Sequence, residues 1–155
     1  MMMPDTGNRY EPIDKLDELT DFLKEHDPEV TDISENSAVV TLKGGSGTEN
    51  NIGIDLGAAS EGEITLFFGG WHKQYSCYGI EGYSDFGGLL EDLDGILNNR
   101  KFAVCAYIGS QWFGSEMAEG TSPNEELLRR KWGDHTRIVC SFRDSGNDTV
   151  FEARL

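Results

Sequence analysis

Two amphipathic helical stripes, each followed by a series of short strand-like runs, constrain the fold of this chain most. In residues 11–27, apolar side chains fall on one side of a helical wheel and carboxylates on the other. Pro12 suits a first helical position, and Pro28 ends the segment. Residues 84–99 repeat the pattern with a leucine-rich stripe. The alternation of helices with groups of strands indicates an antiparallel α+β fold rather than a doubly wound one.

The strand-like runs are rich in β-branched and aromatic residues and are separated by glycine-containing or polar turns. Between the helices they cover residues 30–33, 38–42, 52–56 and 64–68, and after the second helix residues 101–109, 111–117, 136–143 and 149–154. Ser122 has capping-box spacing to Glu125 and predicts a short helix that Gly133 ends. We expect one α+β domain over residues 1–155, mainly antiparallel sheet with two longer amphipathic helices and one short helix. Residues 1–11 are expected to form a flexible N-terminal arm.

The charge of the chain is strongly acidic and unevenly distributed. Its 28 acidic and 13 basic residues give a net charge of −15. Residues 1–43 carry −7 and residues 44–99 carry −8, whereas residues 100–155 are balanced. Such a field repels nucleic acid and anionic membranes and attracts basic proteins. The alternative interpretation is that the acidity only keeps a small protein in solution.

The sequence contains no signal for a disulfide framework, a metal site or a membrane span. The three cysteines are widely spaced and form no Cys-x-x-Cys pair, and the three histidines lie far apart. No apolar run approaches the ~18 residues that cross a bilayer. The first residues lack the features of a signal peptide. We therefore expect a cytoplasmic protein without a metal or cofactor.

Aromatic and polar side chains are densest directly after the run 64–68. Trp71, His72 and Tyr75, together with Tyr78, are candidate anchors of a recognition surface, because Trp and Tyr dominate binding hot spots. The alternative is that Trp71 caps the core and the tyrosines line a loop. A catalytic pair of His72 and Cys77 would need contact at about 3 Å and a third orienting group. The sequence indicates neither, so we expect no enzyme activity.

Four carboxylates of the second helical segment are candidate partner-binding residues: Asp85, Glu91, Asp92 and Asp94. Carboxylates on the helices of small cytoplasmic nuclease inhibitors occupy the positions of nucleic-acid phosphates and speed the encounter with a basic partner. A carboxylate row can also be only a solvated helix face.

Three segments carry a resemblance to a known class of proteins: the run Ile64-Thr65-Leu66-Phe67-Phe68-Gly69-Gly70-Trp71-His72, the acidic helix 84–99 and the run Gln111-Trp112-Phe113-Gly114-Ser115. In these segments the chain resembles small bacterial immunity proteins of polymorphic, contact-dependent toxin systems. The resemblance implies a non-catalytic cytoplasmic protein that binds and neutralises one cognate toxin domain. It assigns no contact residues; those named above come from charge and aromatic placement.

Two other functions stay open. Chaperones or adaptors of secreted effector proteins are also small acidic α+β domains, but they generally finish with a helix, whereas this chain is expected to finish with a hairpin at 136–154. An enzyme or small-ligand protein could use the aromatic segment as a pocket wall. The oligomeric state is not predicted.

Overall fold

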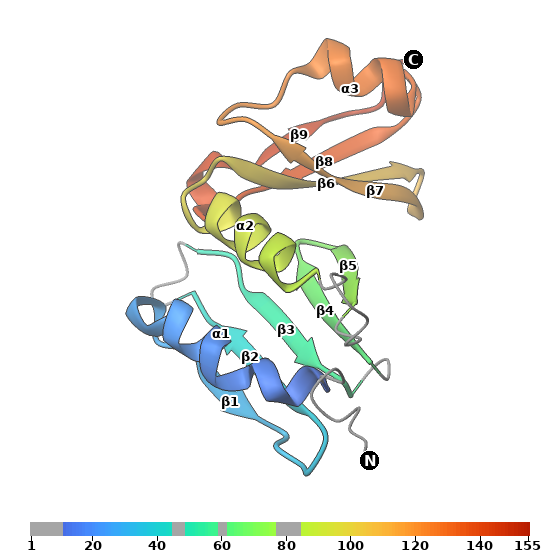
Figure 1. The fold of residues 1–155 in the computed structure, drawn as a ribbon. Helices are drawn as coiled ribbons and strands as arrows, with labels where there is room; N and C mark the ends of the chain where they lie inside the picture. Colours follow the sequence, from blue (N-terminus) through green and yellow to red (C-terminus); the bar gives the residue numbers. More distant parts are fainter. Residues whose placement is uncertain (1–10, 45–48, 59–61, 77–84) are drawn as a thin grey trace. The chain divides into compact units, whose positions relative to one another are not determined.

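The structure is a computed structural model that describes residues 11–44, 49–58, 62–76 and 85–155. It contains two antiparallel sheets, of five and four strands, with α-helices and short 3-10 turns (Figure 1). The α-helices are α1 (Leu16–Phe22), α2 (Phe86–Leu97) and α3 (Glu125–Trp132). The strands are β1 (Glu29–Thr31), β2 (Ala38–Leu42), β3 (Ile52–Leu56), β4 (Glu63–Phe68), β5 (Trp71–Ser76), β6 (Lys101–Ile108), β7 (Gln111–Glu119), β8 (Arg137–Ser141) and β9 (Thr149–Phe151).

The chain divides into two compact units. The first unit comprises Met1–Lys43, Ile52–Phe67 and His72–Asp92, and the second comprises Gly44–Asn51, Phe68–Trp71 and Leu93–Leu155. Each unit is built from chain segments that are distant in sequence. The mixed α+β class with antiparallel sheets is as expected, whereas the single domain with a flexible arm stays a prediction. Residues 1–10 of that arm lie outside the described residues.

The first sheet is a meander in the order β1-β2-β3-β4-β5. Strands β2 and β3 alternate buried and half-buried residues, and Val40 pairs with Ile54 on the buried face. This period of two is the signature of strands with one face on a core. In β4, Ile64, Leu66 and Phe68 face the core, because all three are almost fully buried. Thr65 and Phe67 therefore point to the opposite face.

Helix α1 covers the first sheet and is shorter than the sequence predicts (Figure 1). Pro12–Lys15 and Lys24–His26 form 3-10 turns on either side of its seven residues. Glu11 and Asp14 form a capping box, in which the Glu11 N–H donates to Asp14 Oδ2 at 2.9 Å. Asp27, with φ of 50°, ends the segment in the left-handed region. The predicted continuous helix over 11–27 is therefore wrong in its geometry. Of its predicted apolar side, Leu19 and Leu23 are fully buried, whereas Phe22 is 39% exposed.

Helix α2 keeps the predicted apolar stripe. Phe86, Leu89, Leu93 and Ile96 are at most 5% exposed. Lys15 lies over the Phe86 ring at 5.0 Å and so connects the segment before α1 with the start of α2. Asn99, with φ of 56°, follows the helix and reverses the chain into β6.

The second sheet has the order β7-β6-β8-β9, and α3 covers one face of it (Figure 1). The core between them consists of Phe102, Val104, Leu128, Ile138, Cys140 and Phe142. The Phe102 and Phe142 rings stack with centroids 4.7 Å apart. Asn124, not Ser122, is the N-cap of α3: its side chain accepts from the Leu127 N–H at 3.2 Å. Gly133 ends the helix with φ of 95°, as expected.

Buried polar contacts close the second unit at two places. The Arg129 guanidinium is 6% exposed and donates to the carbonyls of Thr136 and Glu152, which fastens α3 to the start of β8 and to the end of β9. The Asn50 side-chain amide donates to the Phe142 carbonyl at 2.6 Å and to Asp148, so residues from before β3 complete the end of β8. Within the described residues, no helix combines the length and apolar character that crossing a bilayer requires.

Candidate functional site

The predicted aromatic anchors are mostly inside the molecule. Trp71 is 7% exposed and Tyr75 is 1% exposed, because both belong to β5, a strand that returns beside β4 after Gly69-Gly70. His72, between them in β5, is exposed. Tyr78 lies outside the described residues. The structure therefore gives Trp71 and Tyr75 a packing role. For Trp71 this is the alternative stated above, whereas Tyr75, expected in that alternative to line a loop, belongs to a strand.

Tyr75 connects β5 to α2 through Asp92. Its Oη donates to Asp92 Oδ2 at 2.5 Å, and Lys73 Nζ lies 3.9 Å from the same carboxylate oxygen. Lys73 also lies over the Tyr75 ring at 5.0 Å. Burial, and then the hydrogen bond to the anionic Asp92, raise the pKa of the Tyr75 phenol. This phenol stays protonated at neutral pH, so the contact stabilises the fold and supplies no nucleophile.

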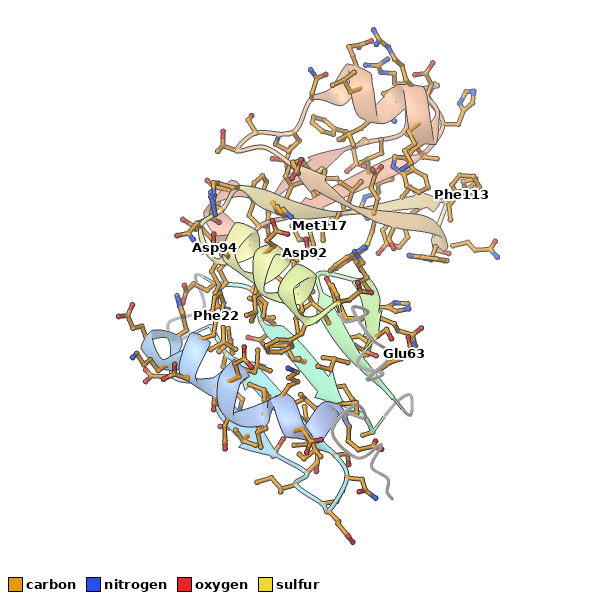
Figure 2. The ribbon with its side chains drawn as sticks, in the orientation of Figure 1. Phe22, Glu63, Asp92, Asp94, Phe113 and Met117 are labelled. Atoms are coloured by element: carbon orange, nitrogen blue, oxygen red, sulfur yellow. The ribbon has the colours of Figure 1, made fainter. Side chains whose placement is uncertain are left out.

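The four predicted carboxylates have different surroundings, and Figure 2 labels two of them, Asp92 and Asp94. Asp92 is 14% exposed in its side chain and engaged with Tyr75. Asp94 pairs with Arg100 at 2.5 Å and accepts from the Asn98 side chain. Asp85 and Glu91 are exposed and form no ion pair within the described residues. Only these two of the four therefore present free carboxylates, and their spacing along the chain places them on different sides of the helix axis.

Acidic charge is concentrated in the first unit. Its segments contain 18 acidic and 5 basic residues, a net charge of −13, whereas the second unit contains 10 acidic and 8 basic residues, a net charge of −2. The exposed acidic residues of the first unit that form no ion pair among residues 11–44, 49–58, 62–76 and 85–92 are Glu11, Asp14, Asp17, Glu25, Asp27, Asp32, Glu35, Asp85 and Glu91.

Every described basic residue of the first unit is next to an acidic one of the same unit. Lys15 lies 3.8 Å from Glu18, and Lys24 lies 3.9 Å from Asp21. The two remaining pairs are Lys43 with Glu29 at 3.2 Å and Lys73 with Asp92 at 3.9 Å. No described lysine is therefore left to neutralise the exposed carboxylates, and the surface of the first unit presents a strongly negative field.

The exposed aromatic residue beside His72 is Phe67. Its side chain is 44% exposed on the face of the first sheet opposite Ile64 and Leu66, and its ring centroid lies 5.9 Å from that of His72. Thr65 shares this face, and its hydroxyl is buried without a hydrogen-bond partner among the described residues. Phe67 was not among the residues predicted for the surface. Alternation from the buried Ile64 and Leu66 could have indicated it, because strand neighbours point to opposite faces.

A second exposed apolar group lies at the tip of the β6–β7 hairpin in the second unit. Ile108, Trp112 and Phe113 are each about half exposed, at 51%, 55% and 52%. Phe113 contacts the edge of the Trp132 ring with centroids 6.1 Å apart. The Trp132 indole N–H in turn donates to Glu116 Oε2 at 2.6 Å. Exposed aromatic clusters of this kind are typical of protein-binding surfaces.

The thiols of the second unit are poor candidates for chemistry. Burial raises the pKa of Cys105, and it raises the pKa of Cys140 to about 12, with the nearby charge of Asp148 adding to the effect. Protonated, buried thiols are weak nucleophiles and weak metal ligands at neutral pH. Within the part of the chain that the structure describes, no three His, Cys, Asp or Glu side chains are grouped to hold a metal ion.

No family model, curated protein or solved structure matches this chain. Charge, burial and contacts within the chain itself are therefore what indicates its function.

Proposed function

We propose that this protein is a non-catalytic immunity protein, which binds a basic toxin domain and neutralises it through the acidic surface of its first unit. The observation that carries the proposal is the concentration of charge: the first unit has a net charge of −13, and its described lysines are all next to its own carboxylates. The exposed carboxylates without an ion pair, among them Asp85 and Glu91, are thus available to a partner.

The physical basis of inhibition is charge complementarity. A partner that cleaves or binds nucleic acid carries a basic surface for phosphates, and a carboxylate surface competes for it. The field also raises the rate of encounter, which matters for an inhibitor that must bind before the toxin acts. Asp85 and Glu91 are the predicted contacts that the structure leaves exposed. Phe67 and His72, whose ring centroids lie 5.9 Å apart on the first sheet, supply an exposed aromatic anchor.

The phenol and the thiols with raised pKa values lie in the packed interior. Tyr75, Cys105 and Cys140 all have raised pKa values, so each is protonated near neutral pH. An activated nucleophile needs the opposite shift or an adjacent base. These groups act in packing.

The test begins with affinity capture from the lysate of the host cell, using the tagged protein and washes at low and then high salt. We expect one basic protein with a toxic domain to be retained. Co-expression of this chain with that domain should restore growth. Charge reversal at Asp85→Lys and Glu91→Lys should lower the association rate at least about tenfold at low salt.

The matched control reverses two exposed carboxylates of the second unit, Glu119→Lys and Glu152→Lys, whose side chains are 82% and 73% exposed. This control should change the association rate less than about threefold. The proposal fails when the retained protein is not toxic, or when both variant pairs slow association equally. Retention of an effector through its N-terminal segment alone would instead indicate a chaperone.

A further inference from the structure

Five residues form one row across the face of the first sheet that points away from its core. Thr41 of β2 pairs with Glu29 of β1 and with Gly53 of β3. A Cβ at Gly53 would lie 3.8 Å from the Phe67 Cβ of β4, and the Phe67 ring centroid lies 5.9 Å from that of His72 in β5. The row therefore spans all five strands, and its members all belong to the first unit.

Gly53 leaves a place without a side chain in this row, beside an exposed aromatic ring. Among the described residues, the Phe67 Cβ is the one atom within 4 Å of the position where a Cβ of Gly53 would be. The Phe67 side chain is 44% exposed, and His72 is also exposed. A long side chain of a partner can therefore lie over Gly53 with one side against the Phe67 ring.

The charges on this face favour a cation as the occupant. Asp55 of β3 and Glu63 of β4 add two carboxylates to it, because both alternate with buried residues of the core face. Lys73 is the only lysine or arginine within the five strands, and it alternates to the opposite face. Lys43, which follows β2, lies 3.2 Å from Glu29 at the far end of the row. The part of the row around Phe67 thus combines an aromatic surface with negative charge.

We propose that this row binds an arginine side chain of a basic protein partner, with the guanidinium stacked on the Phe67 ring and the methylene groups over Gly53. A guanidinium is flat, keeps its charge and stacks on aromatic rings, whereas an ammonium is compact and more strongly hydrated. Asp55 lies two residues from Gly53 along β3, about 7 Å away, where its charge attracts the guanidinium. This inference rests on the proposed function, because it names the side chain through which the first unit holds its basic partner.

The site is tested with peptides in place of a toxin. The full chain, labelled with ¹⁵N, is titrated with a capped pentapeptide that has one central arginine between serines and glycines, at up to about 20 mM. This peptide should shift the amide signals of Gly53 and Phe67 in a saturable manner. The same peptide with lysine should bind at least about threefold more weakly, and with citrulline, which has the shape without the charge, at least about fivefold more weakly.

Variants that leave the net charge unchanged separate stacking from general attraction. Gly53→Val fills the proposed place and should stay folded, because its Cβ meets the Phe67 Cβ at an ordinary contact distance and valine suits a strand. It should weaken binding of the arginine peptide at least about fivefold, as should Phe67→Ala, which removes the ring. Phe22→Ala is the matched control, because Phe22 lies on α1 of the same unit and is 39% exposed. It should change the affinity less than about twofold.

Equal binding of the arginine and lysine peptides would overturn the proposal, as would equal binding of the arginine peptide to the wild type and to both Gly53→Val and Phe67→Ala. Thermal unfolding of the three variants checks that each is folded. The result is distinct from that for toxin neutralisation. Arginine binding without capture of a toxic protein would support this site and contradict the proposed function. A captured toxin that both variants bind as tightly as the wild type does would support the function and contradict this site.

Discussion

Burial decides the protonation of the reactive side chains in this fold. Tyr75 is 1% exposed, and Cys105 and Cys140 are at most 1% exposed. All three pKa values are raised, because water no longer stabilises their anions. A raised pKa also couples stability to pH. The folded chain retains a proton that the unfolded chain loses, so alkaline conditions favour unfolding.

Replacement of Cys140 by alanine should reduce the alkaline loss of stability. The fold raises the pKa of Cys140 from its ordinary value of 9.0 to about 12. Its stabilising contribution is fully present below pH 9 and is lost as the pH rises toward 12. Between about pH 8 and pH 10.5, the free energy of unfolding of the wild type should fall about 1 to 2 kcal/mol more than that of Cys140→Ala. Urea unfolding at both pH values measures this, and equal losses would contradict it.

The sequence predicts the exposure of the charged residues of the candidate site better than the exposure of its aromatic residues. The exposed Asp85 and Glu91 follow from composition and position, because carboxylates stay in water unless paired. Trp71 and Tyr75 were predicted as anchors, but they are buried. Their spacing of four residues suits a helix as well as a strand, so the sequence did not indicate which side of β5 faces the core.

At the scale of elements, three glycines differ in whether the surrounding atoms leave room for a larger side chain. Gly87, near the start of α2, has no atom within 4 Å of the place where a Cβ would be. At Gly95, in the same helix, an added Cβ would lie 2.6 Å from carbon atoms of the Lys101 side chain. In β7, a Cβ at Gly114 would lie 2.5 Å from the Trp132 ring. Gly114 is therefore needed for the packing of α3 against β7, whereas a larger residue would fit at Gly87 without a clash.

Two alanine substitutions should consequently have opposite effects. Gly114→Ala should destabilise the protein by about 1 to 3 kcal/mol, because Trp132 must move and lose its hydrogen bond to Glu116. Gly87→Ala should stabilise it by about 0.5 to 1 kcal/mol, because alanine favours the helix and meets open space. Chemical denaturation of both variants is the measurement. A stabilised Gly114→Ala protein would show that the Trp132 contact is not tight.

Most elements could be predicted from periodicity, and the exceptions have physical causes. The strands from β2 to β4 and from β6 to β8 lie within two residues of the expected runs, because their β-branched and apolar residues mark them clearly. Strand β9 ends three residues earlier than the expected run. Strand β5 was missed, because the three consecutive polar residues between Trp71 and Tyr75 break that alternation. The helix over 11–27 is divided into a 3-10 turn, an α-helix and a second 3-10 turn. The spacing of apolar residues on a helical wheel does not distinguish a 3-10 turn from an α-helical turn.

At the scale of the whole molecule, charge is segregated between the units. A net charge of −13 in the first unit opposes its own compaction, whereas the second unit, at −2, has little self-repulsion. Salt screens repulsion between exposed charges beyond about 10 Å at 0.1 M. The stability of this protein should therefore depend on ionic strength through its first unit.

The Tm should rise by about 2 to 5 °C between about 0.02 M and 0.5 M NaCl, because screening relieves the repulsion. The triple variant Asp17→Asn/Glu25→Gln/Glu35→Gln removes three unpaired charges of the first unit and should reduce this rise. Glu119→Gln/Glu126→Gln/Glu152→Gln, in the second unit, removes carboxylates that have ion-pair partners and should not reduce it. Differential scanning fluorimetry gives the four curves. A Tm that falls with salt in the wild type would contradict the argument.

The contacts of Asn50 have a consequence for the order of events during synthesis. Its side chain binds Phe142 and Asp148, which are translated about ninety residues later. The five strands of the first sheet all precede residue 77, so they can pair while the rest of the chain is still being made. The second unit is completed only when the end of the chain has left the ribosome. Its edge strand β7 is thus synthesised before β8 and β9, and for that interval β6 has only one of its two neighbours.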